Sequence, residues 1–285
     1  MDSVSSPVIY GVLGFPAKHS LSPLMHNRAF SALGIPAEYR IFEKSPEELK
    51  FFLTSLAEEH IRGLNVTIPY KEAVLEYLKK ESPEVRFTGA ANTLIVKDND
   101  YLEGWNTDGI GFHRHLITDL RFEPAGKAVV ILGAGGAAKA VTDQLARQGV
   151  KTIAIFDVDK EKSTKLTAKL AQEFPAVHCR CADALEDIDL RDTDMLVNAT
   201  PVGMKKDDPC LIAADKLHSG LLVYDLIYNP AETELLRRAR AKGATASNGL
   251  GMLLYQGARS FELWTGKDAP VELMRQALEE GVKKL

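Results

Sequence analysis

The sequence predicts an α/β protein of two domains: an N-terminal domain built on a mainly parallel sheet, and a Rossmann-type dinucleotide-binding domain. Three observations lead to this prediction. Short aliphatic runs alternate with helical patterns in the first third of the chain, a buried apolar run ends in a glycine-rich turn at Gly133, and the chain has 285 residues, 45% of them hydrophobic. A chain of this size and composition can bury two cores, so two domains are expected rather than one.

The first third of the chain consists of three successive strand and helix patterns. The expected strands lie at 8–14, 37–42 and 61–68, and the expected helices at 22–34, 45–60 and 70–80. The second helix has the clearest start, with Ser45 as N-cap, Pro46 at the first helical position and Glu48 placed for a capping box. This alternation predicts βα units on a mainly parallel sheet.

Residues 92–106 depart from that alternation. Two β-like runs flank the polar residues Asp98 to Asp100, which is typical of a hairpin. A second unit then begins near Lys127, where residues 127–149 predict a buried strand, a glycine turn and a helix, followed by a strand at 152–158.

Further apolar strands are expected at 195–200 and 221–228. With no Pro- or Ser-rich linker in the chain, the domain boundary is expected inside the helix that follows Trp105, and the amphipathic tail is expected to return to the first domain. The predicted domains are therefore 1–110, joined by helices at about 250–285, and a dinucleotide-binding domain at 111–249.

The glycine turn has the form G-x-G-x-x-[GA], from Gly133 to Ala138. Gly133 would permit the tight turn out of the strand, and Gly135 would let backbone amides approach a pyrophosphate at the helix N-terminus. Asp157 ends the second strand, at the position that reads the adenosine ribose in such folds. Its carboxylate would accept both ribose hydroxyls and repel a 2′-phosphate. A solvated strand-end aspartate is the alternative, and Lys160 and Lys162 could offset the repulsion.

Composition excludes several classes of protein. The formal net charge is -4 and no basic stripe is present, so nucleic acid is an unexpected partner. No apolar run approaches the roughly 20 residues that span a bilayer, and the first ten residues lack the pattern of a signal peptide, so a cytoplasmic protein is expected. Cys179, Cys181 and Cys210 have neither disulfide nor zinc spacing, so no metal is expected.

Polar residues of the first domain concentrate in four short strings, KHSLSP, NVTIPYK, GAANT and GWNTDG. The carboxyl ends of strands in open α/β sheets form ligand sites, so these turns can converge. We therefore expect a small ligand rich in hydroxyl or carboxylate groups.

These strings, together with GAGGAAKA, NATPVGM, YDLIYNPAETELL and NGLGMLLYQGA, resemble the shikimate dehydrogenase family over nearly the whole chain. The resemblance implies reversible NAD(P)H-dependent reduction of 3-dehydroshikimate to shikimate, a step of chorismate and aromatic amino acid biosynthesis. By this resemblance Lys71 corresponds to the family's catalytic lysine and Asp108 to its partner. Hydride reduction of a ketone builds negative charge on oxygen, which an ammonium group can stabilise and protonate.

The resemblance also assigns binding residues. Ser20 and Ser22 would hold the substrate carboxylate, an assignment to be weighed against ordinary helix capping. The remaining substrate residues would contact hydroxyl groups and are Asn65, Thr67, Asn92, Tyr228 and Gln256. The residues implied at the cofactor are Gly133, Ala134, Gly135, Gly136, Ala137, Asp157, Thr200, Gly249 and Met252.

One segment departs from the family. Many NADP-using members have an Asn-Arg-Thr type segment after the second strand, whereas this chain has Asp157, Val158 and Asp159. The cofactor is therefore expected to be NAD(P), with NAD favoured by Asp157 although NADP is the family norm. An NAD-dependent quinate/shikimate dehydrogenase of quinate catabolism is the enzymatic alternative, and a ligand-sensing module the non-enzymatic one. Monomer and homodimer both stay open.

Overall fold

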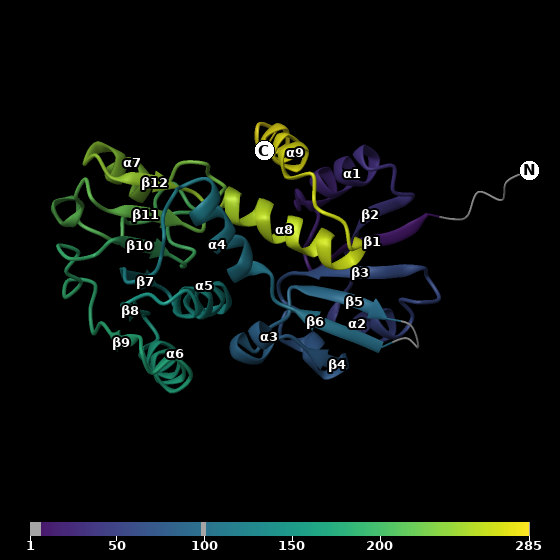
Figure 1. Ribbon diagram of the computed structural model, residues 1–285, viewed down its shortest axis with the longest axis horizontal. Coiled ribbons are helices and arrows are strands. Elements are labelled where there is room, and N and C mark those ends of the chain that lie inside the picture. Colours follow the sequence, from purple (N-terminus) through teal and green to yellow (C-terminus); the bar gives the residue numbers. More distant parts are fainter. Residues whose placement is uncertain (1–6, 98–100, 285) are drawn as a thin grey trace, which may run out of the picture. The chain divides into compact units, whose positions relative to one another are not determined.

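The computed structural model describes residues 7–97 and 101–284. The chain divides into two compact units, which we call unit 1 (Met1–Gly111 with Leu254–Leu285) and unit 2 (Phe112–Leu253). Both are layered α/β structures (Figure 1), as predicted. Helices α4 (Asp108–Thr118) and α8 (Leu250–Thr265) each begin in one unit and end in the other.

Unit 1 contains a six-stranded sheet in the order β2-β1-β3-β5-β6-β4. Its strands are β1 (Val8–Gly14), β2 (Ala37–Glu43), β3 (Ile61–Val66), β4 (Leu78–Glu81), β5 (Thr93–Lys97) and β6 (Tyr101–Trp105). β5 runs antiparallel to both of its neighbours, and the other pairings are parallel. The predicted hairpin is thus confirmed by its two strands, while its turn at residues 98–100 lies outside the described residues.

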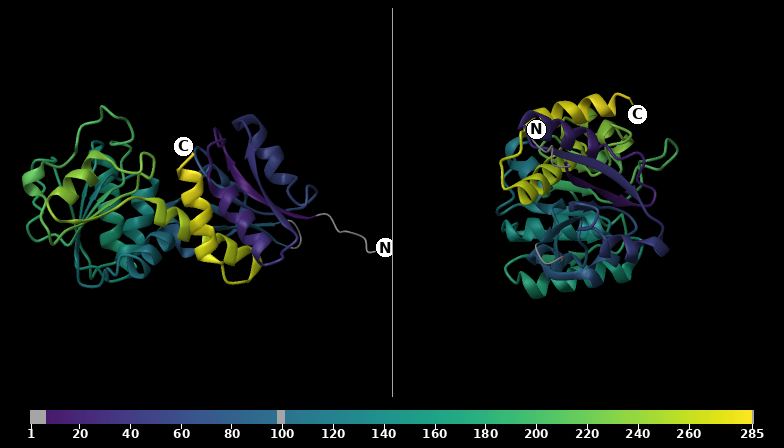
Figure 2. Two further views of the ribbon diagram at one scale, coloured as in Figure 1. Left: turned by 90° about the horizontal axis from the view of Figure 1, so that it is seen from above. Right: turned by 90° about the vertical axis from the view of Figure 1, so that its right-hand side faces the viewer.

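The helices of unit 1 are α1 (Ser22–Ala32), α2 (Pro46–Thr54), the 3-10 helix η1 (Ala73–Tyr77), α3 (Pro83–Thr88) and α9 (Val271–Val282). α2 begins as predicted, because the Glu48 carboxylate accepts from the backbone N–H of Ser45 at 2.8 Å. The C-terminal α9 lies beside α1 (Figure 2), with Arg28 3.3 Å from Glu280.

The prediction of a helix over 70–80 is wrong in its second half. One turn of 3-10 helix at η1 gives way to β4, which pairs in parallel with β6. Leu78 lies opposite Leu102 in that pairing. Pairing at the sheet edge therefore overrides the helical periodicity of the local sequence.

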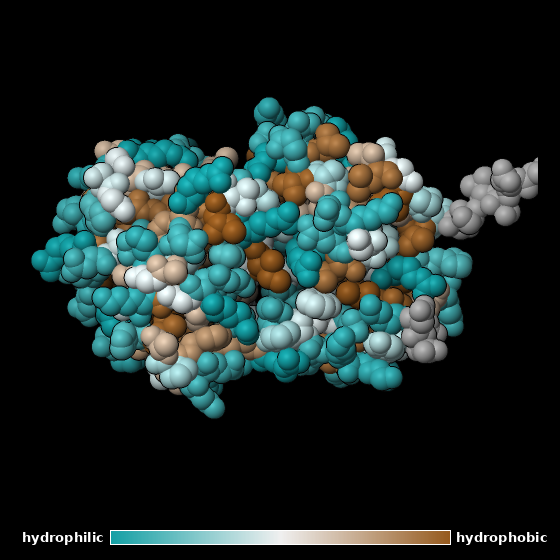
Figure 3. Space-filling view, in the orientation of Figure 1, coloured by the Kyte–Doolittle hydropathy of each residue, from teal (hydrophilic) through white to brown (hydrophobic). Residues whose placement is uncertain are grey.

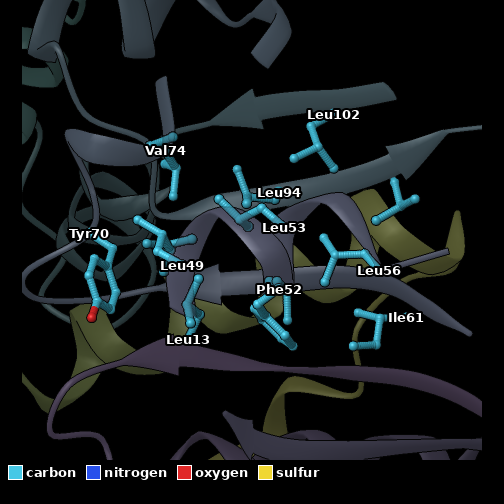
Figure 4. Close-up of a cluster of buried hydrophobic side chains, with 14 of the residues drawn as sticks. Leu13, Leu49, Phe52, Leu53, Leu56, Ile61, Tyr70, Val74, Leu94 and Leu102 are labelled. Atoms are coloured by element: carbon cyan, nitrogen blue, oxygen red, sulfur yellow. The ribbon is translucent and has the colours of Figure 1, made fainter. Parts of the chain in front are cut away.

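A core of fifteen buried residues occupies one side of the sheet in unit 1 (Figure 4). Phe52 and Leu53 from α2 pack there with Leu64 of β3 and Leu94 of β5, and the ring of Tyr70 closes one end of the cluster. The residue that precedes Lys71 is therefore anchored in the hydrophobic core.

Unit 2 contains an all-parallel sheet in the order β12-β11-β10-β7-β8-β9. Its strands are β7 (Ala128–Leu132), β8 (Thr152–Phe156), β9 (His178–Cys181), β10 (Met195–Asn198), β11 (Leu222–Asp225) and β12 (Thr245–Ser247). Its helices are α5 (Gly136–Arg147), α6 (Lys160–Glu173), the 3-10 helix η2 (Ala214–Lys216) and α7 (Glu234–Ala241). The strand order reverses between β7 and β10, which is the position where such sheets bind ligands.

The face drawn in Figure 3 is mostly hydrophilic, with hydrophobic residues in scattered spots. Among the described residues, no helix combines the length and the apolar character needed to cross a membrane.

Candidate active site

The polar site of unit 1 is built from residues that leave the sheet at several places. Lys71 follows β3, Asn92 immediately precedes β5, and Asp108 is the first residue of α4. Gln256 comes from α8, more than 140 residues later in the chain. Parallel and antiparallel pairing thus brings residues that are far apart in the sequence into one cluster.

Lys71 and Asp108 form the ion pair of this cluster. Lys71 Nζ donates to Asp108 Oδ2 at 2.7 Å, and the two side chains are 30% and 12% exposed. Asp108 lies in the first turn of α4, where the helix dipole favours a carboxylate. The side chain of Lys71 is therefore held in one place while part of it stays exposed.

Asn92 orients the other oxygen of Asp108. Its Nδ2 donates to Asp108 Oδ1 at 2.8 Å and to Gln256 Oε1 at 3.3 Å. Its Oδ1 accepts from the backbone N–H of Thr107 at 2.8 Å. Since a backbone N–H can only donate, this contact fixes which way the amide points.

Asn65 belongs to a second polar group directly beside the first. The hydroxyl of Tyr39 donates to Asn65 Oδ1 at 2.7 Å, and Asn65 Nδ2 donates to Ser260 Oγ at 2.9 Å and to Thr93 Oγ1 at 3.2 Å. Thr93 Oγ1 in turn donates to Asn92 Oδ1 at 3.0 Å. One buried hydrogen-bond network therefore connects Asn65 with Asn92.

Ser20 and Ser22 lie in the connection from β1 to α1. The hydroxyl of Ser20 accepts from the backbone N–H of Ser22 at 3.3 Å, and Leu21 at the N-cap position provides no side-chain cap. Both hydroxyls thus lie at a helix N-terminus, which favours an anionic ligand. Thr67 follows β3 nearby, and its backbone N–H donates to Leu13 O, the next-to-last residue of β1, at 2.9 Å.

Sequence reasoning missed the residues that support this site. Tyr39, Thr93, Thr107 and Ser260 are buried and hydrogen-bonded to the predicted site residues. Thr93 and Thr107 could have been found, since they lie within the GAANT and GWNTDG strings. Tyr39 and Ser260 come from stretches with no local sign of a polar role.

The glycine turn of unit 2 fits a dinucleotide. Gly133 has φ +103, and a Cβ atom there would lie 2.9 Å from the carbonyl oxygen of Ala199, so only glycine suits this turn. At Gly135 and Gly136 an added Cβ would meet nothing within 4 Å. α5 begins at Gly136, and its N-cap residue, Gly135, has no side chain with which to cap the helix. Its first backbone N–H groups therefore have open space in which a pyrophosphate could bind.

Asp157 follows β8 and contacts this turn. Its Oδ2 accepts from the backbone N–H of Ala134 at 2.6 Å, and its Oδ1 accepts from the backbone N–H of Asp159 at 2.8 Å. The two lysines that follow are engaged with other carboxylates: Lys160 lies 2.5 Å from Asp183, and Lys162 lies 3.3 Å from Asp159. Asp157 is therefore hydrogen-bonded to the glycine turn through its Oδ2.

The remaining predicted residues of unit 2 lie on its strand ends and on α8. Thr200 Cγ2 would lie 3.2 Å from a Cβ at Gly133, so Thr200 borders the glycine turn. Gly249 packs against the Leu226 carbonyl, and Met252 is buried on α8. Tyr228 follows β11, and burial raises the pKa of its phenol. Ala137 lies in the first turn of α5.

No group of three or more His, Cys, Asp or Glu side chains within residues 7–97 and 101–284 is arranged to hold a metal ion.

Comparisons with known proteins match both units. Family models described as the shikimate dehydrogenase substrate binding domain and the shikimate 5'-dehydrogenase C-terminal domain match residues 12–94 and 249–279, and a TrkA-N domain model matches 129–246. A shikimate dehydrogenase (NADP⁺) from Methanopyrus kandleri is 45% identical over 96% of each chain.

Two solved structures are similar over nearly the whole chain. One is shikimate 5-dehydrogenase from Listeria monocytogenes in complex with shikimate and NAD, which is 36% identical, with a TM-score of 0.90 and 98% of both chains covered. The other is quinate dehydrogenase from Corynebacterium glutamicum in complex with NAD, which is 32% identical, with a TM-score of 0.88 and coverage of 96% of this chain and 99% of that one.

Proposed function

Since this chain belongs to the shikimate dehydrogenase family, we propose that it catalyses the reversible reduction of 3-dehydroshikimate to shikimate with NAD(P)H. The observation that carries the proposal is the 2.7 Å contact between Lys71 and Asp108, in which Asp108 also accepts a hydrogen bond from Asn92. A reaction that turns a ketone into an alcohol requires a proton donor at the oxygen, and this pair supplies one.

A reduced nicotinamide cofactor, when bound at the glycine turn of unit 2, would supply the hydride that reduces the carbonyl carbon. Lys71 donates a proton to the oxygen on which negative charge develops. Asp108 holds the amino group of Lys71 in place through their 2.7 Å contact and so directs it toward the reacting oxygen. In the reverse direction the same lysine, once neutral, accepts the proton of the shikimate hydroxyl.

The substrate would be held in unit 1. Ser20 and Ser22 would donate to its carboxylate at the start of α1. Asn65, Thr67, Asn92 and Gln256 would contact its ring hydroxyl groups. Asn92 and Gln256 each have amide atoms in the same cluster as Asp108, so they suit the hydroxyl next to the reacting carbon.

The cofactor would be held in unit 2, at the glycine turn from Gly133 to Ala137. The first N–H groups of α5 would bind its pyrophosphate. Asp157 would face the adenosine ribose, with Thr200, Gly249 and Met252 toward the other end of the cofactor. Cytoplasmic location is part of the proposal, and the free thiols of Cys179, Cys181 and Cys210 suit a reducing compartment.

A spectrophotometric assay tests the proposal by combining shikimate or quinate with NAD⁺ or NADP⁺. Shikimate should be oxidised with the higher kcat/KM. Faster oxidation of quinate would assign the protein to quinate catabolism, and folded protein without turnover on either acid would overturn the proposal. Calorimetric binding of shikimate by such an inactive sample would favour a ligand sensor.

A further inference from the structure

Glu43 lies at the end of β2, opposite Gly14 at the end of β1. Its side chain reaches across to the connection that leaves β1. Glu43 Oε1 accepts from the backbone N–H groups of Ala17 at 2.8 Å and Lys18 at 3.1 Å. Glu43 Oε2 lies 3.4 Å from Lys18 Nζ. A single oxygen atom therefore holds two successive backbone amides of this loop.

Two further hydrogen bonds link this part of the loop to Ser20 and Ser22. The carbonyl oxygen of Ala17 accepts from the backbone N–H of Ser20 at 3.0 Å. The hydroxyl of Ser20 then accepts from the backbone N–H of Ser22 at 3.3 Å. The position of the Ser20 hydroxyl, and through it the backbone of Ser22, thus depends on a turn that Glu43 fixes from a neighbouring strand.

The ion pair with Lys18 does not explain why Glu43 is placed here. The Lys18 side chain is 78% exposed, and exposed pairs of this kind contribute little because water and salt screen them. The two backbone contacts are short and converge on one oxygen. The hydrogen bond from Ala17, more than the lysine, lowers the pKa of the Glu43 carboxyl.

We propose that Glu43 is a positioning residue for substrate binding, which holds the Ala17–Lys18 turn so that Ser20 and Ser22 are ordered to receive the substrate carboxylate before it arrives. This inference rests on the proposed role of the two serines. If the loop were disordered before binding, part of the binding free energy would be spent on ordering it, and affinity would be lower. A loop that is already ordered avoids this entropic cost. The benefit falls on the ground state and the transition state alike, so it acts on KM.

Three variants test the proposal in the full-length protein. Glu43→Ala removes both backbone contacts, and KM for shikimate should rise roughly three- to tenfold, with kcat and the cofactor KM little changed. Glu43→Gln keeps an oxygen where Oε1 now lies, so its KM should stay near the wild-type value. Glu38→Ala is the matched control, because Glu38 belongs to the same strand and pairs with the exposed Arg40.

The outcomes separate this inference from the proposed function. An active wild type together with an unchanged KM in Glu43→Ala overturns the role of Glu43 and leaves the function intact. If KM for shikimate rises as much in Glu43→Gln as in Glu43→Ala, the negative charge of Glu43 is what affects KM and not its contacts with the backbone. That result also overturns the inference.

A second measurement needs no catalysis. Hydrogen exchange of the segment 15–22 should be faster in Glu43→Ala than in wild type, Glu43→Gln and Glu38→Ala, because two hydrogen-bonded amides lose their acceptor. Equal exchange in all four proteins overturns the inference even if the wild type proves inactive on shikimate.

Discussion

The side-chain amide of Asn92 donates to Asp108 Oδ1 at 2.8 Å while its own oxygen accepts from the backbone of Thr107 at 2.8 Å. Asp108 divides its carboxylate between this amide and the ammonium group of Lys71. The three side chains are thus coupled to one another, so the effects of substituting them on activity should not be additive.

Replacing Lys71 by alanine should reduce kcat much more than it changes KM. The lysine acts on charge that develops only in the transition state, and loss of such a donor costs about 2.7–4 kcal/mol, or roughly a hundred- to thousandfold in rate. Steady-state kinetics with shikimate would measure this. Lys50→Ala, on the exposed surface of α2, serves as the control. A Lys71→Ala enzyme with wild-type kcat would exclude Lys71 from proton transfer.

Ser22→Ala should show the opposite pattern, with KM for shikimate raised and kcat nearly unchanged. The carboxylate of the substrate does not react, so its anchoring is shared by ground state and transition state. The same kinetic experiment measures both constants. A collapse of kcat at constant KM would contradict the anchoring role.

Asp157→Asn should shift cofactor preference from NAD toward NADP. Two negative charges at ~4 Å repel by roughly 1 kcal/mol in water and by more where water is excluded. The asparagine oxygen can still accept from Ala134, as Asp157 does now. The ratio of kcat/KM for the two cofactors, measured in wild type and variant, decides the matter. A wild type that already prefers NADP, as the name of its relative from Methanopyrus kandleri indicates for that enzyme, would show that Asp157 does not select the cofactor.

His26 should make the fold sensitive to acid. The ring is fully buried and stacks on Tyr39 with 4.4 Å between centroids, and neither ring nitrogen has a hydrogen-bond partner among the described residues. Burial lowers the pKa of His26 to about 3, below the value of about 6.5 in an unfolded chain. Below pH 6.5 the unfolded state binds a proton that the folded state excludes, so stability is lost as the pH falls toward 3.

The size of the effect is about 1.4 kcal/mol per pH unit between the two pKa values, so the free energy of unfolding should fall by roughly 2–3 kcal/mol between pH 7 and pH 4.5 through this residue alone. His26→Phe retains a ring for stacking and should remove that part of the slope. Denaturant unfolding of both proteins at the two pH values measures it, with His178→Gln on the exposed strand β9 as control. Equal slopes in wild type and His26→Phe would show that protonation of His26 is not responsible.

The sequence predicted those features that depend on local pattern. The capping box at Ser45, the alternation of strands and helices and the glycine turn at Gly133 each lie within a few neighbouring residues, and the structure contains all three. The strand β4 was mispredicted because its conformation depends on pairing with β6. For the same reason the buried hydroxyl of Ser260 could not be found, since its partner Asn65 lies 195 residues away in the chain.

The division of unit 1 between both ends of the chain affects how the protein is made. Synthesis proceeds from the N-terminus, so the first 111 residues emerge well before α8, and residues 112–253 are translated in between. At typical elongation rates this delay lasts on the order of ten seconds. During that time Asn65 and Asn92 lack the hydrogen bonds that Ser260 and Gln256 later provide. Unit 2 can therefore fold first, while the hydrogen-bond network of unit 1 is completed only once α8 has been made.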